Sequence, residues 1–89
     1  MKAYILIQAV PGTDGALASE IADIAGVSRV ERVTGAYDLI AEADGVDPRD
    51  VVPRIQELGG VLRALASLVL GGPEPVLTLS EPKVEATGA

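Results

Sequence analysis

Residues 32–42, "RVTGAYDLIAE", place a tight turn between two strand-like segments near the middle of the chain. The turn lies at residues 34–36, where glycine supplies the positive-φ conformations that tight turns need. A strand is predicted on each side, over residues 27–33 and 37–43, so the two strands form an antiparallel hairpin. Because a ring and a carboxylate, Tyr37-Asp38, follow the turn at once, this hairpin is also a candidate edge of a binding site.

Two longer apolar segments flank the hairpin and are predicted as strands, residues 2–10 ("KAYILIQAV") and 61–70 ("VLRALASLVL"). Both carry apolar residues at positions of both parities, and successive side chains of a strand point to opposite faces of a sheet. Both faces of these strands therefore need to be covered. Residues 76–79 ("VLTL") form a further short strand-like segment.

A helix is predicted in each gap between the hairpin and its flanking strands. The first helix spans residues 14–25, with Thr13 or Asp14 as its N-cap and Gly26 as its C-terminal cap. Its apolar residues recur at helical spacing: Leu17, Ile21 and Ile24.

The second helix ends at Gly59-Gly60 and has two possible starts because Pro53 lies within its span. Its apolar residues also follow helical spacing: Val51, Ile55 and Leu58. Proline is tolerated in the first turn of a helix and costs about 3 kcal/mol deeper inside. Either Asp50 is the N-cap of a short helix, or Asp47 caps a helix that begins at Pro48 and is kinked at Pro53.

An internal repeat fixes the order of these elements. When the chain is shifted by 34 residues, Tyr4–Ala9 aligns with Asp38–Ala43, and Gly26-Val27 aligns with Gly60-Val61. The chain is thus two β-α-β units in tandem. This order predicts an α+β fold of the ferredoxin-like type, β-α-β-β-α-β, with an antiparallel sheet and two helices on one face.

The other face of this sheet has no predicted helix to cover it. A solvated face of an antiparallel sheet carries polar residues, yet residues 2–10 and 61–70 are apolar on both sides. Large exposed apolar patches are rare on monomers. We therefore expect a second copy to cover this face, which gives a homodimer with a shared hydrophobic interior, a dimeric α/β-barrel-type association.

The composition disfavours several classes of function. The chain of 89 residues suits one domain, and it contains no cysteine and no histidine, so the commonest general base and nitrogen metal ligand are missing. We expect no cofactor, no metal and no enzymatic activity. Seven basic against thirteen acidic residues give a net charge of −6, which disfavours direct DNA binding. The N-terminal apolar run is too short to span a membrane, so we expect a cytoplasmic protein without membrane association.

Asp38 differs from the other carboxylates because it lies between the turn and the apolar Leu39-Ile40. Three roles are open to it: hydrogen bonding to the backbone amides of the turn, contact with a ligand ammonium group or an interface, or catalysis, for which no partner base is present. The charged residues of the hairpin are expected to form cross-strand pairs on a surface: Arg29, Glu31, Arg32 and Glu42.

The segment "GVSRVERVTGAYDLIAEA" (26–43), followed one helix later by "LGGVLRALASLVL" (58–70), resembles the effector-binding domain, or RAM domain, of the Lrp/AsnC (feast/famine) regulators. The most specific marks are the "GV" that closes each helix and the "VTGAYDL" turn. The resemblance covers roughly residues 2–70, and we assign residues 1–79 to this domain. Residues 80–89 are expected to be a disordered tail because they carry too little apolar content to pack.

The resemblance implies dimers that associate through their sheets and often assemble, four dimers together, into an octamer. It also implies that an amino acid or a related small metabolite binds between dimers, near the turn. A glycine leaves turn amides open to a carboxylate, and an aspartate can receive an ammonium group. The predicted ligand-binding residues are the turn and two positions of the last strand: Thr34, Gly35, Ala36, Tyr37, Asp38, Ala64 and Ala66.

Two features depart from the family pattern. The chain begins at the first strand of the effector domain, without a helix-turn-helix, so we expect a stand-alone version that does not itself bind DNA. Many members carry Thr-x-Thr hydroxyls on the last strand, where this chain has Ala64 and Ala66, and this change favours a more apolar ligand or none. Ser67 is one position off and is expected to point to the opposite face.

Three functions remain open. The leading hypothesis is a non-enzymatic, oligomeric module that senses an amino-acid-type effector and modulates a full-length Lrp/AsnC paralogue through mixed assembly. The second is a purely structural or protein-interaction module, in which the assembly itself is the function. The third is a small enzyme, since ferredoxin-like dimers also host monooxygenase and isomerase chemistry, although the missing histidine and cysteine count against it.

Overall fold

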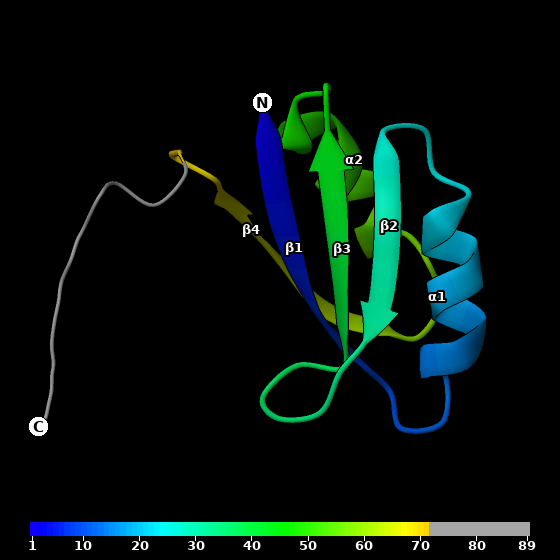
Figure 1. Cartoon of the computed structure of the whole chain (residues 1–89). Helices are drawn as coiled ribbons and strands as arrows, with labels where there is room; N and C mark the ends of the chain where they lie inside the picture. Colours follow the sequence, from blue (N-terminus) through cyan, green and yellow to red (C-terminus); the bar gives the residue numbers. More distant parts are fainter. Residues whose placement is uncertain (72–89) are drawn as a thin grey trace, which may run out of the picture.

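In the computed structural model of the chain, residues 1–71 are described, and they form helices and strands in the predicted order (Figure 1). The elements are β1 (Lys2–Ala9), α1 (Asp14–Ala22), β2 (Val27–Arg32), β3 (Leu39–Asp44), α2 (Pro48–Gln56) and β4 (Val61–Leu68). The strand predicted over residues 76–79 and the tail over 80–89 lie outside the described residues.

The four strands form one antiparallel sheet in the order β2-β3-β1-β4. β1 therefore lies in the interior of the sheet, between β3 and β4. α1 packs over β2 and β3, whereas α2 packs over β4, and both helices lie on the same side of the sheet (Figure 1). This arrangement confirms the predicted α+β, ferredoxin-like fold.

The strand register places every second residue of β1 on the helix side. Ile5 lies opposite Ala41 of β3, and Ile7 lies opposite Leu39. The aliphatic core is made of these alternate strand residues and the inner sides of both helices: Ala3, Ile5, Ile7, Ala9, Leu17, Ile21, Leu39, Ala41, Ala43, Val51, Ile55 and Ala64. Full burial of one large aliphatic side chain contributes about 1.5–3 kcal/mol, so this face supplies most of the hydrophobic stabilisation of the single chain.

α1 is shorter than predicted and ends at Ala22 instead of residue 25. The amides of Asp23 and Ile24 bond to carbonyl oxygens only three residues back, so the helical pattern tightens and stops there. Gly26 is therefore not the cap of the helix. With φ at 95° it turns the chain into β2, and an added Cβ would lie 2.6 Å from Cγ2 of Val46, which leaves room only for glycine.

The N-termini of the two helices are built differently. Thr13 occupies the N-cap position of α1, but its hydroxyl bonds to the preceding turn and makes no capping hydrogen bond. The N-cap of α2 is Asp47, whose carboxylate accepts a hydrogen bond from the amide of Arg49 at 2.9 Å. α2 thus begins at Pro48, the second of the two predicted starts, and Pro53 lies inside it.

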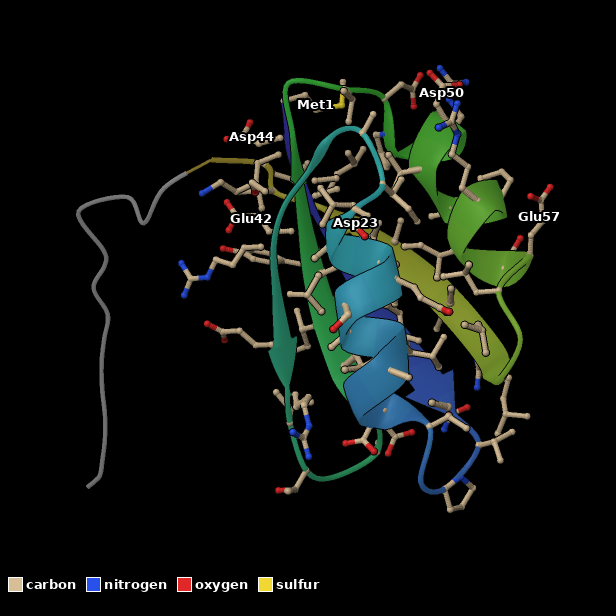
Figure 2. All side chains as sticks on the ribbon, turned by 90° about the vertical axis from the view of Figure 1, so that its right-hand side faces the viewer. Met1, Asp23, Glu42, Asp44, Asp50 and Glu57 are labelled. Carbon is tan, nitrogen blue, oxygen red and sulfur yellow. The ribbon has the colours of Figure 1, made fainter. Side chains whose placement is uncertain are left out.

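The side of the sheet opposite the helices is covered by no helix or strand of residues 1–71 (Figure 2). We call this surface the open face. Its apolar side chains come from β1, β3 and β4: Tyr4, Leu6, Ile40 and Leu65. Tyr4 on the interior strand β1 and Leu65 on the edge strand β4 expose 41% and 38% of their surface, which is a large fraction for apolar side chains.

Candidate functional site

The loop between β2 and β3, residues 33–38, extends from the end of the sheet at which β1 ends (Figure 1). It is closed by a hydrogen bond of 2.9 Å from the amide of Val33 to the carbonyl oxygen of Asp38. Its tip, residues 34–36, is exposed, whereas the two residues that follow are half-buried. Gly35 has φ at 123°, a conformation that favours glycine. The five predicted turn residues thus belong to one loop with an exposed tip.

Asp38 is fastened to β1 by two hydrogen bonds. Its amide donates to the carbonyl oxygen of Ile7 at 2.9 Å, and its carboxylate Oδ2 accepts from the amide of Ala9 at 2.7 Å. The pairing of β1 with β3 ends at Ile7 and Leu39, so the amide of Ala9, two residues further along β1, lies beyond this ladder. The carboxylate therefore bonds to the backbone, as one predicted role required, but to β1 rather than to its own turn.

Gln8 fastens the tip of the same loop. Its side-chain Nε2 donates to the carbonyl oxygen of Ala36 at 2.9 Å. Within residues 1–71, the other carboxylate oxygen of Asp38, Oδ1, accepts no hydrogen bond. The loop is thus held to β1 at its tip and at its end, while one acceptor of Asp38 stays available.

The two predicted positions of β4 lie in a different part of the molecule. Ala64 and Ala66 are on the helix side, where Ala64 is buried and Ala66 is exposed. They line a hollow of about 490 Å³ between β4 and α2, together with Pro48, Arg49, Val52, Pro53, Leu65 and Leu68. No turn residue lines this hollow, so one copy does not bring the two parts of the predicted site together. Ser67 lies on the other face, opposite Tyr4.

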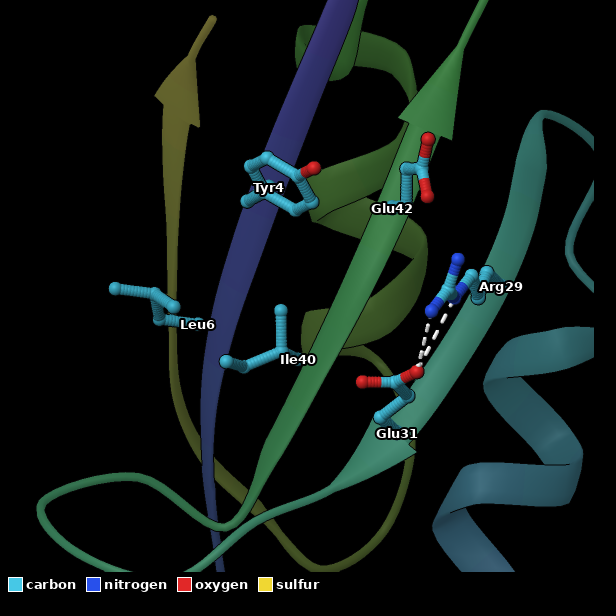
Figure 3. Close-up of a pocket in the computed structure, with 6 residues that line it drawn as sticks. All are labelled: Tyr4, Leu6, Arg29, Glu31, Ile40 and Glu42. Atoms are coloured by element: carbon cyan, nitrogen blue, oxygen red, sulfur yellow. Dashed lines mark hydrogen bonds and ion pairs between the residues drawn. The ribbon is translucent and has the colours of Figure 1, made fainter.

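A second hollow, of about 460 Å³, lies on the open face (Figure 3). We call it the sheet-face hollow; it is lined by Tyr4, Leu6, Arg29, Glu31, Ile40 and Glu42. Leu6 and Ile40 lie opposite each other on β1 and β3. The hollow was not predicted from the sequence, because only the register of three strands brings its lining residues together. The alternation of Arg29 and Glu31 along β2 was the only local sign of a polar surface there.

The charged residues of the sheet-face hollow are paired, but not as the sequence predicted. Arg29 bonds to Glu31 on its own strand, with Nη2 and Nε at 2.7 and 3.2 Å from Oε2. Glu42 does form a cross-strand pair, but with Lys2 of β1 at 3.2 Å. These hydrogen bonds raise the pKa of Arg29, through Glu31, and the pKa of Lys2, through Glu42.

Arg32, the third charged residue of β2, points to the helix side. It pairs with Asp14 of α1, with Nε 2.9 Å from Oδ2, and so forms no pair within the hairpin. β2 therefore divides its two arginines between the two faces of the sheet, because strand residues three positions apart point to opposite sides.

Two features are absent from residues 1–71. No helix in this range is long and apolar enough to cross a membrane. In the same part of the chain, no group of three histidine, cysteine, aspartate or glutamate side chains is arranged to hold a metal ion.

Solved structures match this chain, although no protein-family model and no curated protein does so. TTHA0845 from Thermus thermophilus is 34% identical, with a TM-score of 0.75, and the match covers 82% of this chain and 96% of that one. FFRP-DM1 is 19% identical, with a TM-score of 0.65, over 78% of this chain and 97% of that one. AsnC from Escherichia coli is 14% identical, with a TM-score of 0.70, over 88% of this chain and 55% of that one. At these low identities the last two show likeness of fold, and this chain spans about half of AsnC.

Proposed function

Because the chain belongs to the Lrp/AsnC family and corresponds to its effector-binding domain, we propose that it senses a small, amino-acid-type effector and assembles into oligomers. In this proposal it is not an enzyme, works in the cytoplasm and uses residues 1–79 as its domain. The observation that carries the proposal is the loop over residues 33–38, which is held to β1 while its tip stays exposed. A surface that is ordered before binding loses little conformational entropy when a ligand arrives.

The loop offers partners for both charged ends of an amino acid. Apart from Gly35 and its two chain neighbours, no heavy atom of residues 1–71 lies within 4 Å of the place where a Cβ on Gly35 would stand, which leaves space at the tip for a carboxylate to reach its amides. Oδ1 of Asp38 is left to accept from an ammonium group. Since Ala64 and Ala66 line a separate hollow, we propose that the loop of one dimer meets the β4–α2 hollow of another.

The open face supports association through the sheets. Two sheets pack about 10 Å apart, with the side chains of their facing surfaces between them. A two-fold axis lets one apolar surface cover its own copy, so Tyr4, Leu6, Ile40 and Leu65 of two chains would form a shared interior. Four such dimers joined through their loops would form the octamer that the family resemblance implies.

Light scattering of the Leu6→Ser variant tests the dimer. The wild type is expected to have at least twice the 9.1 kDa mass of the chain at micromolar concentration, and the variant to shift toward one chain. Leu68→Ser is the matched control, because Leu68 is 51% exposed but lies opposite Ala3, on the helix side, where it lines the β4–α2 hollow; its loss can separate dimers from one another but should leave each dimer intact. A wild type that is monomeric, or equal dissociation by the control, would contradict the sheet-to-sheet dimer.

A thermal-shift screen against the amino acids at millimolar concentration tests the sensing role. A ligand that binds only the folded state raises the melting temperature in proportion to RT ln(1 + [L]/Kd). If no amino acid stabilises the protein, the sensing role is wrong. Mixed assembly with a full-length Lrp/AsnC paralogue predicts that such a regulator is retained with the chain in a pull-down from its source cells.

A structural module is the second candidate, and the bond between Asp38 and Ala9 favours it because this carboxylate already has a structural partner. Asp38→Ala separates the two candidates. Loss of the ligand response with an intact oligomer supports sensing, whereas collapse of the oligomer supports the structural module.

A further inference from the structure

We infer that the sheet-face hollow is a second binding site, made for free α-amino acids with apolar side chains, which closes when two copies pack through their open faces. This second site rests on the dimer of the proposed function, but its ligand would lie away from the loop over residues 33–38. Three features of the hollow carry this assignment: an apolar floor, a guanidinium with a free donor, and a carboxylate with a free acceptor.

The floor of the hollow suits an aliphatic side chain. Leu6 and Ile40 lie side by side on β1 and β3, and the ring of Tyr4 lies next along β1 (Figure 3). Binding sites for small molecules are concave and mostly apolar, with volumes of roughly 300–1,000 Å³. The hollow, at about 460 Å³, is large enough for an amino acid such as leucine.

Arg29 supplies the partner for the carboxylate of the ligand. Its Nε and Nη2 bond to Glu31, so the guanidinium is held in place, and Nη1 donates no hydrogen bond within residues 1–71. Figure 3 shows this guanidinium between Glu31 and Glu42. Arginine pairs well with carboxylates because its planar donors match their geometry.

Glu42 supplies the partner for the ammonium group. Within residues 1–71 only its Oε2 has a partner, Lys2, and its side chain is 15% exposed, so water already has little access to it. Arg29 and Glu42 face each other in the β2–β3 register, which puts a donor and an acceptor on the same side of the floor.

The charges of the site select for a zwitterion. Lys2 and Arg29 balance Glu31 and Glu42, so the group has no formal net charge. A ligand with a single charge would leave one unbalanced charge inside the closed dimer, and buried unpaired charges are costly. An α-amino acid adds one charge of each sign. Its carboxylate can accept from Nη1 of Arg29, and its ammonium group can donate to the second carboxylate oxygen of Glu42. Its binding therefore favours the closed dimer.

Calorimetry with leucine and two analogues tests the assignment. The probes are leucine, 4-methylpentanoate, which lacks the ammonium group, and 3-methylbutylamine, which lacks the carboxylate. Leucine is expected to bind at least tenfold more tightly than either analogue and to lower the dimer dissociation constant measured by sedimentation. Equal binding of leucine and one analogue would overturn the zwitterion site.

Two arginine variants locate the site. Arg29→Gln is expected to weaken leucine binding at least tenfold. Arg32→Gln is the matched control, because both arginines lie on β2, both are paired with a carboxylate, and their side chains are 63% and 65% exposed, but Arg32 is on the helix side. If Arg29→Gln binds leucine like the wild type while Asp38→Ala abolishes binding, the loop is the site and the sheet-face hollow is not. If the wild type binds no amino acid, the proposed function is wrong as well.

Discussion

β1 is apolar on both sides, yet its two sides meet different surroundings. Ile5 and Ile7 point under the helices and are 0% exposed, whereas Tyr4 is 41% exposed on the open face and Leu6 is half-buried there. Residue type does not separate the two faces; coverage by the chain's own helices does. The covered face stabilises the single chain, and the open face gains its full hydrophobic contribution only when another surface covers it.

The pair Ile5→Ala and Leu6→Ala tests this difference with the largest expected effect. Ile5→Ala removes buried atoms from a packed core and should cost about 2–5 kcal/mol in the free energy of unfolding. Leu6→Ala should cost clearly less in dilute solution, where its side chain is only partly buried. Urea unfolding monitored by circular dichroism, at several protein concentrations, measures both.

The concentration series sharpens the comparison. If the open face is a dimer interface, the loss of unfolding free energy caused by Leu6→Ala should rise with protein concentration. The loss caused by Ile5→Ala, measured against the wild type at the same concentration, should stay constant. Equal losses from both variants at low concentration would show that the two faces are equally covered within one chain.

Most of the fold could be predicted because local pattern and global topology agree. The repeat, the turn at Gly35 and the double-sided apolar pattern of β1 all indicate the same sheet. Element ends were less predictable, since they depend on distant partners. α1 stops before Gly26, and β3 begins at Leu39 because Asp38 and the residue before it belong to the loop that is held to β1.

The candidate sites show more clearly what could not be predicted from the sequence. The sequence placed Arg29 and Glu42 on a common surface, and the register confirms that they face each other, but Arg29 bonds to Glu31 instead. Local spacing does not reveal which of two nearby carboxylates an arginine selects. Nor does it reveal that Ala64 lines a hollow away from the turn, since that depends on how α2 covers β4.

Asp38 bonds to the amide of Ala9 at the end of β1, and its replacement gives the second largest expected effect. Asp38→Ala leaves the part-buried amide of Ala9 without its acceptor, which should cost about 1–3 kcal/mol. Asp38→Asn keeps a side-chain oxygen and should cost less. Hydrogen exchange of the Ala9 amide distinguishes the cause, because its protection should fall in the alanine variant and largely persist in the asparagine variant. Equal losses in both variants would mean that charge, not this hydrogen bond, holds the loop.

Two ion pairs in contact with water, one on each side of the sheet, should give small pH dependences of opposite sense. On the open face, Glu42 raises the pKa of Lys2 above its ordinary value of 10.5, so this contribution is complete below that pH and is lost as the pH rises through the raised pKa. On the helix side, the side chain and then the backbone amide of Arg49 lower the pKa of Asp47 below 3.8. That contribution is present above pH 3.8 and is lost as the pH falls through the lowered pKa.

The variants Lys2→Gln and Asp47→Asn separate these two effects in melting curves recorded from about pH 2 to about pH 11, a range that spans both ordinary pKa values. Lys2→Gln should flatten only the alkaline decline in melting temperature, and Asp47→Asn only the acid decline, because asparagine can still cap α2 but cannot titrate. Both effects should be at most a few degrees, since Lys2 and Arg49 are 40% and 89% exposed and ion pairs with such access to water contribute little. The alkaline effect should also grow with protein concentration, because closing the open face removes water from Lys2 and Glu42, whereas the acid effect should not. Concentration dependence at both ends of the pH range would mean that the helix side, too, is buried on association. The open face would then not be the only face that a second copy covers.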